Sequence, residues 1–411
     1  MVSKRKQPLF LSFLMYYSSC FSRLRGVQAF STQIAAFSKK VPKPRQSTKK
    51  SLQASLSTES SIAVVTEQMR TDSLKSFGTL CEYYDNLVFD FKPPLLGRTP
   101  SDVVDYLQKH AITTVLFDCD GVLYRSPAPA PQAAAALQTL VDNGMRIFFV
   151  TNNSAANPNQ LQAKLTHILG LPPDDNFLTT DMMISTAWTA AQYLKQQLLD
   201  NRENDDSPIP RAYVIGSDGL KEEIENTGIH VIRDADDQSN PTMSREALAD
   251  HDFDAMEPID AVVVGHDTSF SFRKLSIANV LLQRNPQALW VATNKDAFDL
   301  VGADGRHIPG NGSLVAALEC SSGRTAVNVG KPSQLLIDLL KSVHGVHAQS
   351  GTMFVGDRLD TDIKFALDTD MHAALVMTGV TTASQLQELQ GGTDEFPLPT
   401  LIVPHVGFFA S

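Results

Sequence analysis

The sequence predicts an α/β fold, a doubly wound parallel sheet with a second αβ domain inserted into it. Two observations lead to this prediction. After residue 99, short apolar runs alternate with segments of helical periodicity, the pattern of a parallel sheet with crossover helices. In addition, 176 residues lie between Ser154 and Lys331, far more than a single crossover connection requires.

The composition is that of a folded, acidic protein. Of the 411 residues 43% are hydrophobic, so the chain can bury a large core. The 45 acidic residues outnumber the 35 basic ones, for a net charge of −10, and this balance argues against a nucleic-acid partner. The four cysteines show no CxxC spacing. Neither a disulfide framework nor a zinc site is therefore predicted.

The first 58 residues differ sharply from the rest of the chain. They hold seven Lys, four Arg and no Asp or Glu, so they carry +11 and the remainder −21. Lys4-Arg5-Lys6 followed by an apolar stretch is typical of a signal peptide, and the basic, Ser-rich stretch from Phe30 onward is typical of a transit peptide. In series they resemble the bipartite presequences of plastids acquired by secondary endosymbiosis. We therefore expect a plastid protein; a mitochondrial presequence, or a disordered tail on a cytoplasmic protein, is the alternative.

No apolar run approaches the roughly 20 residues of a membrane-spanning helix, so the mature form is expected to have no membrane partner.

Residues 59–98 have a weak pattern and are interpreted as a leader. Thr99-Pro100 predicts the start of a helix over 103–110, and residues 182–199 predict a helix of the core. The predicted divisions are a presequence (1–58), a leader (59–98), the first part of the core (99–205), an inserted domain (206–321) and the second part of the core (322–411).

Four predicted core strands each end on polar residues. Residues 113–117 lead to Asp118, 146–150 to Thr151-Asn152-Asn153-Ser154, 326–329 to Gly330-Lys331, and 352–355 to Gly356-Asp357. Because the carboxyl ends of parallel strands form the ligand crevice, we expect these four ends to converge. Carboxylates, a hydroxyl, amides and one ammonium together suit a divalent cation and a phosphoryl group.

The motifs at these strand ends resemble, in order, the four motifs of the haloacid dehalogenase superfamily. They are Asp118-Cys119-Asp120-Gly121-Val122-Leu123-Tyr124, Thr151-Asn152-Asn153-Ser154, Gly330-Lys331-Pro332-Ser333 and Gly356-Asp357-Arg358-Leu359-Asp360-Thr361-Asp362. With the long insert, the set is similar to the branch of phosphoglycolate phosphatase, pyridoxal phosphatase and 4-nitrophenylphosphatase. The resemblance runs from about residue 111 to the C-terminus. It implies a Rossmann-like core and an inserted cap domain that closes over the crevice.

The resemblance also implies a phosphatase that works through an aspartyl-phosphate. Asp118 would attack phosphorus, and Asp120 would first protonate the leaving oxygen and then deprotonate the hydrolytic water. Lys331 would neutralise the nucleophile and a phosphoryl oxygen. The phosphoryl group would be bound by Thr151, Asn152, Asn153 and Lys331.

Mg²⁺ is the expected cofactor, since this hard ion is held by few carboxylates and keeps water and phosphate oxygens as ligands. By resemblance its protein ligands are Asp118, the backbone carbonyl of Asp120 and Asp357. Asp362, five residues beyond Asp357, is expected near the metal or Lys331 as a supporting residue. Cys119 and Asp360 receive no role.

The insert is expected to select the substrate, a small phosphorylated metabolite. Its predicted strands are 212–215, 261–264 and 289–292, and its best specificity segments are 293–296 and 309–313. A cation for a carboxylated substrate could come from Lys221, Arg273, Lys274, Lys295, Arg306 or His307. A homodimer through this domain is a further expectation.

The favoured substrate is 2-phosphoglycolate, whose removal serves photorespiration in plastids. This step is a biological association and not residue chemistry. A broad phosphatase of the 4-nitrophenylphosphatase type, or a pyridoxal phosphate phosphatase, is the main alternative, although residues 296–299 lack the His that often accompanies the latter activity. A phosphoprotein phosphatase and a non-catalytic scaffold are less favoured, because the acidic and basic residues of all four motifs are intact.

Overall fold

The computed structural model describes residues 58–86, 92–172, 177–200, 208–234, 242–301, 306–347, 351–389 and 392–410. Apart from Thr58, the predicted presequence lies outside these ranges. Among the helices within them, none is long and apolar enough to cross a membrane.

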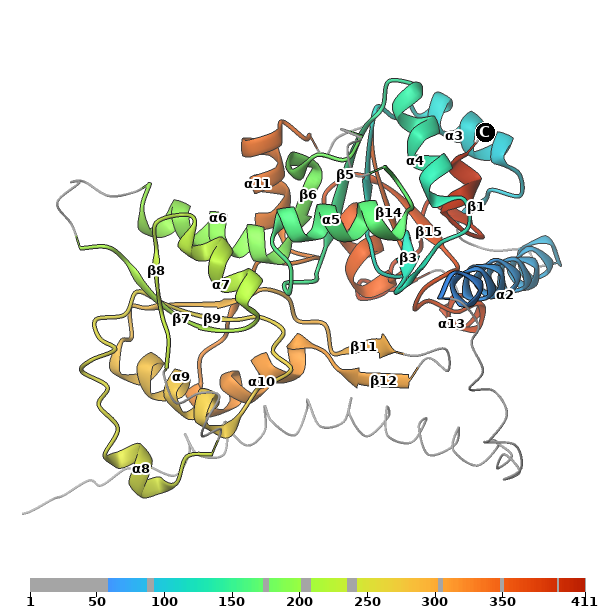
Figure 1. The fold of residues 1–411 in the computed structure, drawn as a ribbon. Helices are drawn as coiled ribbons and strands as arrows, with labels where there is room; N and C mark the ends of the chain where they lie inside the picture. Colours follow the sequence, from blue (N-terminus) through green and yellow to red (C-terminus); the bar gives the residue numbers. More distant parts are fainter. Residues whose placement is uncertain are drawn as a thin grey trace, which may run out of the picture. The chain divides into compact units, whose positions relative to one another are not determined.

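The core contains a seven-stranded sheet in which all pairings are parallel (Figure 1). In spatial order its strands are β1 (Leu95–Leu96), β16 (Leu401–Val403), β15 (His372–Val376), β14 (Thr352–Gly356), β2 (Thr114–Phe117), β5 (Arg146–Thr151) and β6 (Met183–Ser185). The strand β2 lies between β14 and β5, so the carboxyl ends of these three strands are neighbours. The predicted α/β fold class is confirmed.

Both faces of this sheet are covered by helices. Along β2, Val115 and Phe117 pack into one apolar cluster and Leu116 into another, because successive side chains of a strand point to opposite faces. The first cluster includes residues of α3 (Pro100–Lys109), α4 (Ala133–Asp142), α5 (Pro158–Ile168) and the 3₁₀ turn η3 (Val406–Phe409). The second includes residues of α11 (Gln334–His344), α12 (Lys364–Asp368) and α13 (Ala383–Glu388).

The helix predicted from Thr99-Pro100 is α3. The Thr99 side chain accepts a hydrogen bond from the backbone of Asp102, whose carboxylate accepts one from the backbone of Thr99. This capping box satisfies two amide groups that the first turn of a helix leaves free. The weak leader pattern hid a longer element, α2 (Thr58–Asn86), which buries Met69, Phe77 and Leu80 against the core.

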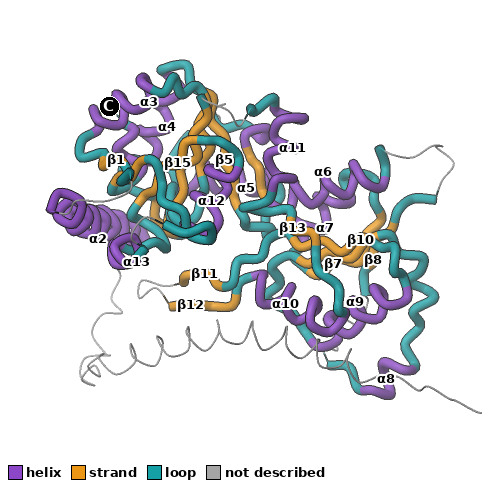
Figure 2. The backbone as a smooth tube through the Cα atoms, turned by 180° about the vertical axis from the view of Figure 1, so that it is seen from behind, coloured by secondary structure: helices purple, strands orange, loops and turns teal. Residues whose placement is uncertain are grey.

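The insert has its own five-stranded parallel sheet (Figure 2). In spatial order its strands are β13 (Val327–Asn328), β10 (Leu289–Ala292), β9 (Ala261–Val264), β7 (Arg211–Ile215) and β8 (His230–Ile232). One face packs on α9 (Phe272–Arg284) and α10 (Asn311–Ser322), and the other on α6 (Thr186–Leu198) and α7 (Asp218–Glu225). Smaller elements are α8 (Arg245–Ala249), the 3₁₀ turn η1 (Thr180–Met182), and the hairpins β3 (Tyr124–Arg125) with β4 (Ala128–Pro129) and β11 (Phe298–Val301) with β12 (Arg306–Pro309).

Two elements differ from the sequence-based expectation. The strand before Lys331, expected in the core sheet, is β13 and pairs with β10 of the insert. The helix α6, expected to complete the core, places Ala187, Ala190 and Ala191 in an apolar cluster with the insert sheet. Elements on both sides of the predicted limits 206 and 321 thus pack with the insert.

Candidate active site

Three buried carboxylates meet at the carboxyl edge of the core sheet. Asp118 follows β2, Asp357 follows the neighbouring strand β14, and Asp362 lies in the π-helical turn η2 (Leu359–Ile363) that comes next. One oxygen from each residue can be chosen so that all three lie within 4.8 Å of one another. A cluster of oxygen ligands of this kind suits a hard divalent cation.

Asp357 fits into this edge because two glycines leave it room. Gly121 has φ +86°, a conformation that favours glycine, and a Cβ atom there would lie 2.6 Å from Asp357 Oδ2. A Cβ atom on Gly379 would overlap the Asp357 carboxylate outright. The same oxygen, Oδ2, accepts a hydrogen bond of 2.6 Å from the amide of Val380.

Lys331 reaches the carboxylates although its preceding strand belongs to the other sheet. Its Nζ lies 2.6 Å from Asp118 Oδ1, 2.9 Å from Asp362 Oδ1 and 2.9 Å from the carbonyl oxygen of Val150. The side chain is only 2% exposed, so the two ion pairs are buried. Burial alone would lower the pKa of Lys331, but the paired carboxylates together outweigh it, so the pKa is raised and the ammonium stays charged.

Both carboxylate oxygens of Asp362 are bonded to other groups of the protein. Its Oδ2 accepts hydrogen bonds from the amides of Asp357 (3.0 Å) and Arg358 (3.1 Å), and its Oδ1 is paired with Lys331. The sequence leaves open whether this residue lies near the metal or near Lys331. In the structure it does both, because it pairs with Lys331 and also lies in the cluster with Asp118 and Asp357. By contrast, Asp118 Oδ2 accepts no protein hydrogen bond within the described ranges.

Burial decides the electrostatics of the cluster. It raises the pKa values of Asp118 and Asp357, and the neighbouring carboxylates add to the effect. When all three carboxylates are ionised, they carry two more charges than the Lys331 ammonium balances. Arg358 also attracts Asp357, but its guanidinium is hydrogen-bonded to Asp360. A bound divalent cation would balance the two remaining charges.

Asp120 is exposed, unlike the other motif carboxylates. Its Oδ2 accepts a 2.8 Å hydrogen bond from the hydroxyl of Tyr124, which in turn accepts one of 2.8 Å from Lys164 Nζ. Burial raises the pKa of Tyr124, so this hydroxyl stays protonated and donates to Asp120. Tyr124 lies in the first motif, but the motif alone predicts no role for it, and no sequence signal marks Lys164.

The loop after β5 carries three of the residues predicted to bind the phosphoryl group. Thr151 is buried, and its Oγ1 accepts the amide of Asn153 at 3.1 Å, which leaves its hydroxyl hydrogen for a ligand. The Asn152 side chain is held within the protein by contacts to Lys331 and Asp296. Asn153 is exposed, and its Oδ1 accepts the amide of Ala155.

Most of the cations proposed for substrate selection are paired with carboxylates of the insert. The pairs are Lys221 with Asp218 (3.9 Å), Arg273 with Asp234 (2.5 Å), Lys274 with Asp267 (2.7 Å) and Lys295 with Glu319 (2.7 Å). His307 stacks on Phe298 across the β11–β12 hairpin, with ring centroids 4.0 Å apart. Asn294 and Asn311 are buried, and Asn311 Nδ2 donates to the carbonyl of Asn294. The two buried asparagines therefore hold the specificity segments together.

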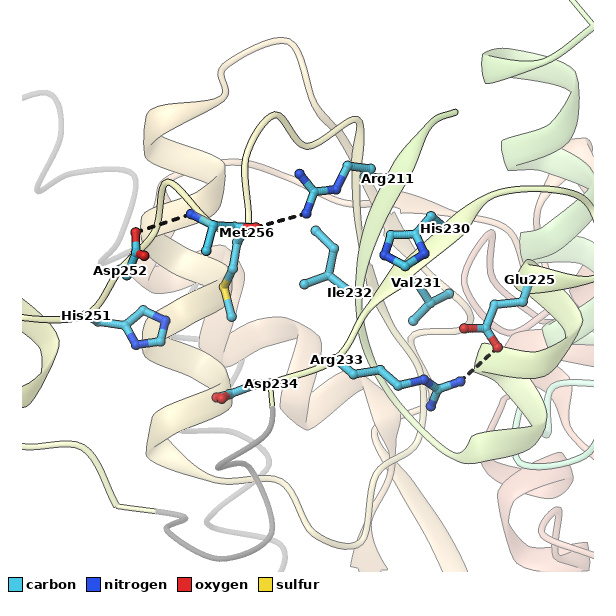
Figure 3. Close-up of a pocket in the computed structure, with 11 residues that line it drawn as sticks. Arg211, Glu225, His230, Val231, Ile232, Arg233, Asp234, His251, Asp252 and Met256 are labelled. Carbon is cyan, nitrogen blue, oxygen red and sulfur yellow. Dashed lines mark hydrogen bonds and ion pairs between the residues drawn. The ribbon is translucent and has the colours of Figure 1, made fainter. Parts of the chain in front are cut away.

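A pocket of about 520 Å³ lies at the β8 edge of the insert (Figure 3) and contains none of the motif residues. Its charged side chains are engaged locally. Arg233 pairs with Glu225 at 2.8 Å, and Arg211 donates to the carbonyl of Ala255 at 3.0 Å. The chemistry predicted by the motifs is therefore not located in this pocket.

Two family models match the chain, haloacid dehalogenase-like hydrolase over residues 115–230 and HAD-hydrolase-like over residues 328–407. Human glycerol-3-phosphate phosphatase is 36% identical over 281 residues, which are 68% of this chain and 83% of the relative. The chain belongs to the haloacid dehalogenase superfamily. The predicted resemblance is thereby confirmed.

Two further members of this superfamily indicate which class of reaction the protein catalyses. Phosphoglycolate phosphatase 2 of Arabidopsis thaliana is 34% identical over 277 residues, which cover 67% of this chain and 86% of the relative. A solved glycerol phosphate phosphatase of Mycobacterium tuberculosis, in complex with magnesium, superposes with a TM-score of 0.56 and 27% identity. That match covers 73% of this chain and 76% of the other. The protein is a haloacid dehalogenase phosphatase of small phosphate esters, a phosphoric monoester hydrolase.

Proposed function

We propose that the protein is a Mg²⁺-dependent phosphatase that hydrolyses 2-phosphoglycolate to glycolate through an aspartyl-phosphate on Asp118. The observation that carries this mechanism is the buried contact of Asp118 with Lys331, next to Asp357 and Asp362. It combines a nucleophile, a fixed cation and oxygen ligands for a metal in one place.

The donor set fits Mg²⁺. Asp118 and Asp357 would hold the ion together with the backbone carbonyl of Asp120, since Asp362 already spends both oxygens on Lys331 and on backbone amides. When bound, Mg²⁺ supplies positive charge that offsets the repulsion between the nucleophile and the phosphoryl oxygens.

The protein residues divide the reaction into two displacements. Asp118 Oδ2 attacks phosphorus while the bond from phosphorus to the ester oxygen breaks. Asp120 donates a proton to that oxygen, then accepts one from the water that attacks the aspartyl-phosphate and regenerates Asp118. The hydroxyl of Tyr124 fixes Asp120 Oδ2, and Asp120 Oδ1 accepts no protein hydrogen bond in the described part of the chain. Thr151 donates to a phosphoryl oxygen. The Lys331 ammonium, 2.6 Å from Asp118 Oδ1, favours the ionised form of the nucleophile, which burial opposes.

The substrate choice draws on the Arabidopsis relative named phosphoglycolate phosphatase and on the plastid-like presequence. The human relative supports glycerol-3-phosphate as the second candidate. Lack of nucleic-acid and membrane partners, and a homodimer through the cap, belong to the same proposal.

Turnover of an ester panel tests this function. We expect the protein from residue 58 onward to hydrolyse 2-phosphoglycolate with a higher kcat/KM than glycerol-3-phosphate, pyridoxal phosphate or sugar phosphates, and only with Mg²⁺. Removal of the metal by EDTA should abolish turnover, and added Mg²⁺ should restore it. Equal rates across the panel would refute the proposed preference for 2-phosphoglycolate. Undiminished turnover in EDTA would refute the proposed requirement for Mg²⁺.

The location is tested by fusing residues 1–58 to a fluorescent protein. We expect the fusion to enter plastids of an alga with secondary plastids, because the segment combines signal-like and transit-like parts. A fusion of residues 30–58 alone, which lacks the signal-like part, is the control and should stay outside. Fluorescence of the full segment in mitochondria or cytosol would refute the plastid proposal.

A further inference from the structure

The insert forms several hydrogen bonds with the core loop that follows β5. Ser154 Oγ accepts the amide of His266 at 3.0 Å, and Ser217 donates to the carbonyl oxygen of Ser154 at 3.3 Å. Asn294 donates to the carbonyl oxygen of Asn152 at 2.7 Å. Three separate loops of the insert therefore hold the segment that carries Thr151.

Asn152 connects this loop to the catalytic lysine through its side chain. Its Oδ1 accepts the Lys331 amide at 2.8 Å, and its Nδ2 lies 3.3 Å from the Lys331 carbonyl oxygen. The same Nδ2 donates to both carboxylate oxygens of Asp296, at 3.0 and 3.1 Å. Asp296 thus fixes the orientation of an amide that holds both backbone groups of Lys331.

A second contact anchors the same part of the insert. Arg358, next to Asp357, donates to the carbonyl oxygen of Phe298 at 3.3 Å, and its guanidinium lies 5.2 Å from the centre of the Phe298 ring. Asp360 holds this arginine through two hydrogen bonds of 3.2 and 3.0 Å. Residues 296–298 therefore contact the loops after β5 and after β14 at once.

We propose that Asp296 is a positioning residue that couples the seating of the insert to the placement of Lys331 against Asp118, through Asn152. The proposal rests on the phosphatase function above. When the insert moves away, Asn152 loses the Asp296 carboxylate and with it the fixed orientation of its amide. Lys331 then loses the support that keeps its ammonium 2.6 Å from Asp118 Oδ1.

The side-chain chemistry explains why a carboxylate is required. A hydrogen bond to an ionised acceptor is stronger and shorter than a neutral one, and two acceptor oxygens fix the plane of the amide. Burial raises the pKa of Asp296 to about 6, while Arg358, Asn152 and Lys331 favour the ionised form and Asp360 opposes it. The carboxylate is therefore mostly ionised at neutral pH.

The test compares Asp296→Ala and Asp296→Asn with Glu319→Gln, all in the chain from residue 58 onward. We expect Asp296→Ala to lower kcat about 10- to 100-fold with KM changed less than about threefold, because the residue acts on the catalytic groups and not on the substrate. Asp296→Asn keeps one acceptor oxygen and should fall between Ala and wild type. Glu319→Gln removes the charge that pairs with Lys295 but keeps an oxygen that can accept the amide of Ala326. It should keep the wild-type kcat, because Glu319 makes no hydrogen bond to Asn152.

Hydrogen exchange provides a readout that does not need turnover. In Asp296→Ala the amides of residues 151–157 should exchange faster than in wild type, while those of the α4 helix should not change. A wild-type kcat in Asp296→Ala, unchanged exchange at 151–157, or a loss expressed in KM alone would overturn the proposal. If the wild type hydrolysed no ester, the phosphatase function would fail, and the exchange experiment would still decide the coupling.

Discussion

Asp118→Asn is expected to reduce kcat by at least about 10⁴-fold on every ester that the wild type hydrolyses. An amide is too weak a nucleophile to attack phosphorus, and removing a nucleophile eliminates the covalent route altogether. Acid quenching of wild-type turnover should trap the phosphorylated chain, and the same quench of Asp118→Asn should trap none. The kcat at saturating ester and Mg²⁺ measures the effect.

The matched control is Asp338→Asn on the exposed face of α11, where the carboxylate accepts a hydrogen bond from Gln334 and from no other described residue. It should keep the wild-type kcat. Because Asn is nearly isosteric with Asp, the folded state of Asp118→Asn should survive, and its unfolding transition checks this. Activity within tenfold of wild type would show that Asp118 does not form the intermediate.

Lys331→Met should cost both activity and stability. The change leaves Asp118 and Asp362 buried without their shared ammonium, and breaking a buried pair in this way costs about 3–5 kcal/mol. We expect the free energy of unfolding to fall by about that amount without Mg²⁺ and by less with it, since a divalent cation restores positive charge. The kcat should fall about 10³-fold or more, because the fixed charge beside the transferred group is gone.

Denaturant unfolding with and without Mg²⁺ measures the change in the free energy of unfolding. The kcat of the folded variant measures the loss of catalysis. Lys341→Met, at an exposed position of the same helix α11 that follows Lys331, should change the free energy of unfolding by less than about 0.5 kcal/mol. An unchanged unfolding free energy in Lys331→Met would mean that the buried pairs do not stabilise this edge of the sheet.

The parts of the site that depend on strand ends could be predicted from sequence. Asp118 and Asp357 each follow an apolar run, and parallel strands deliver such residues to one edge whatever the distance along the chain. The start of α3 was equally accessible, because Thr99, Pro100 and Asp102 form a local capping signal. Both predictions rest on rules that involve only neighbouring residues or a general property of parallel sheets.

Other features depend on tertiary contacts that no local pattern carries. Strand β13 has only two residues, and its apolar run does not tell which of two sheets it joins. The side-chain amide of Asn152 is held by Asp296, 144 residues further along, and by the backbone of Lys331, and no local pattern indicates either contact. Lys164 reaches Tyr124 from a helix whose start and amphipathic face show nothing unusual.

The position of β13 matters for any attempt to recombine this protein with its relatives. Lys331 comes three residues after β13, a strand of the insert sheet. The catalytic lysine is therefore joined directly to the sheet of the insert. A chimera that exchanges residues 206–321 would separate β13 from the strand β10 beside which it folds. A junction placed after Ser333 would carry the strand and its lysine together.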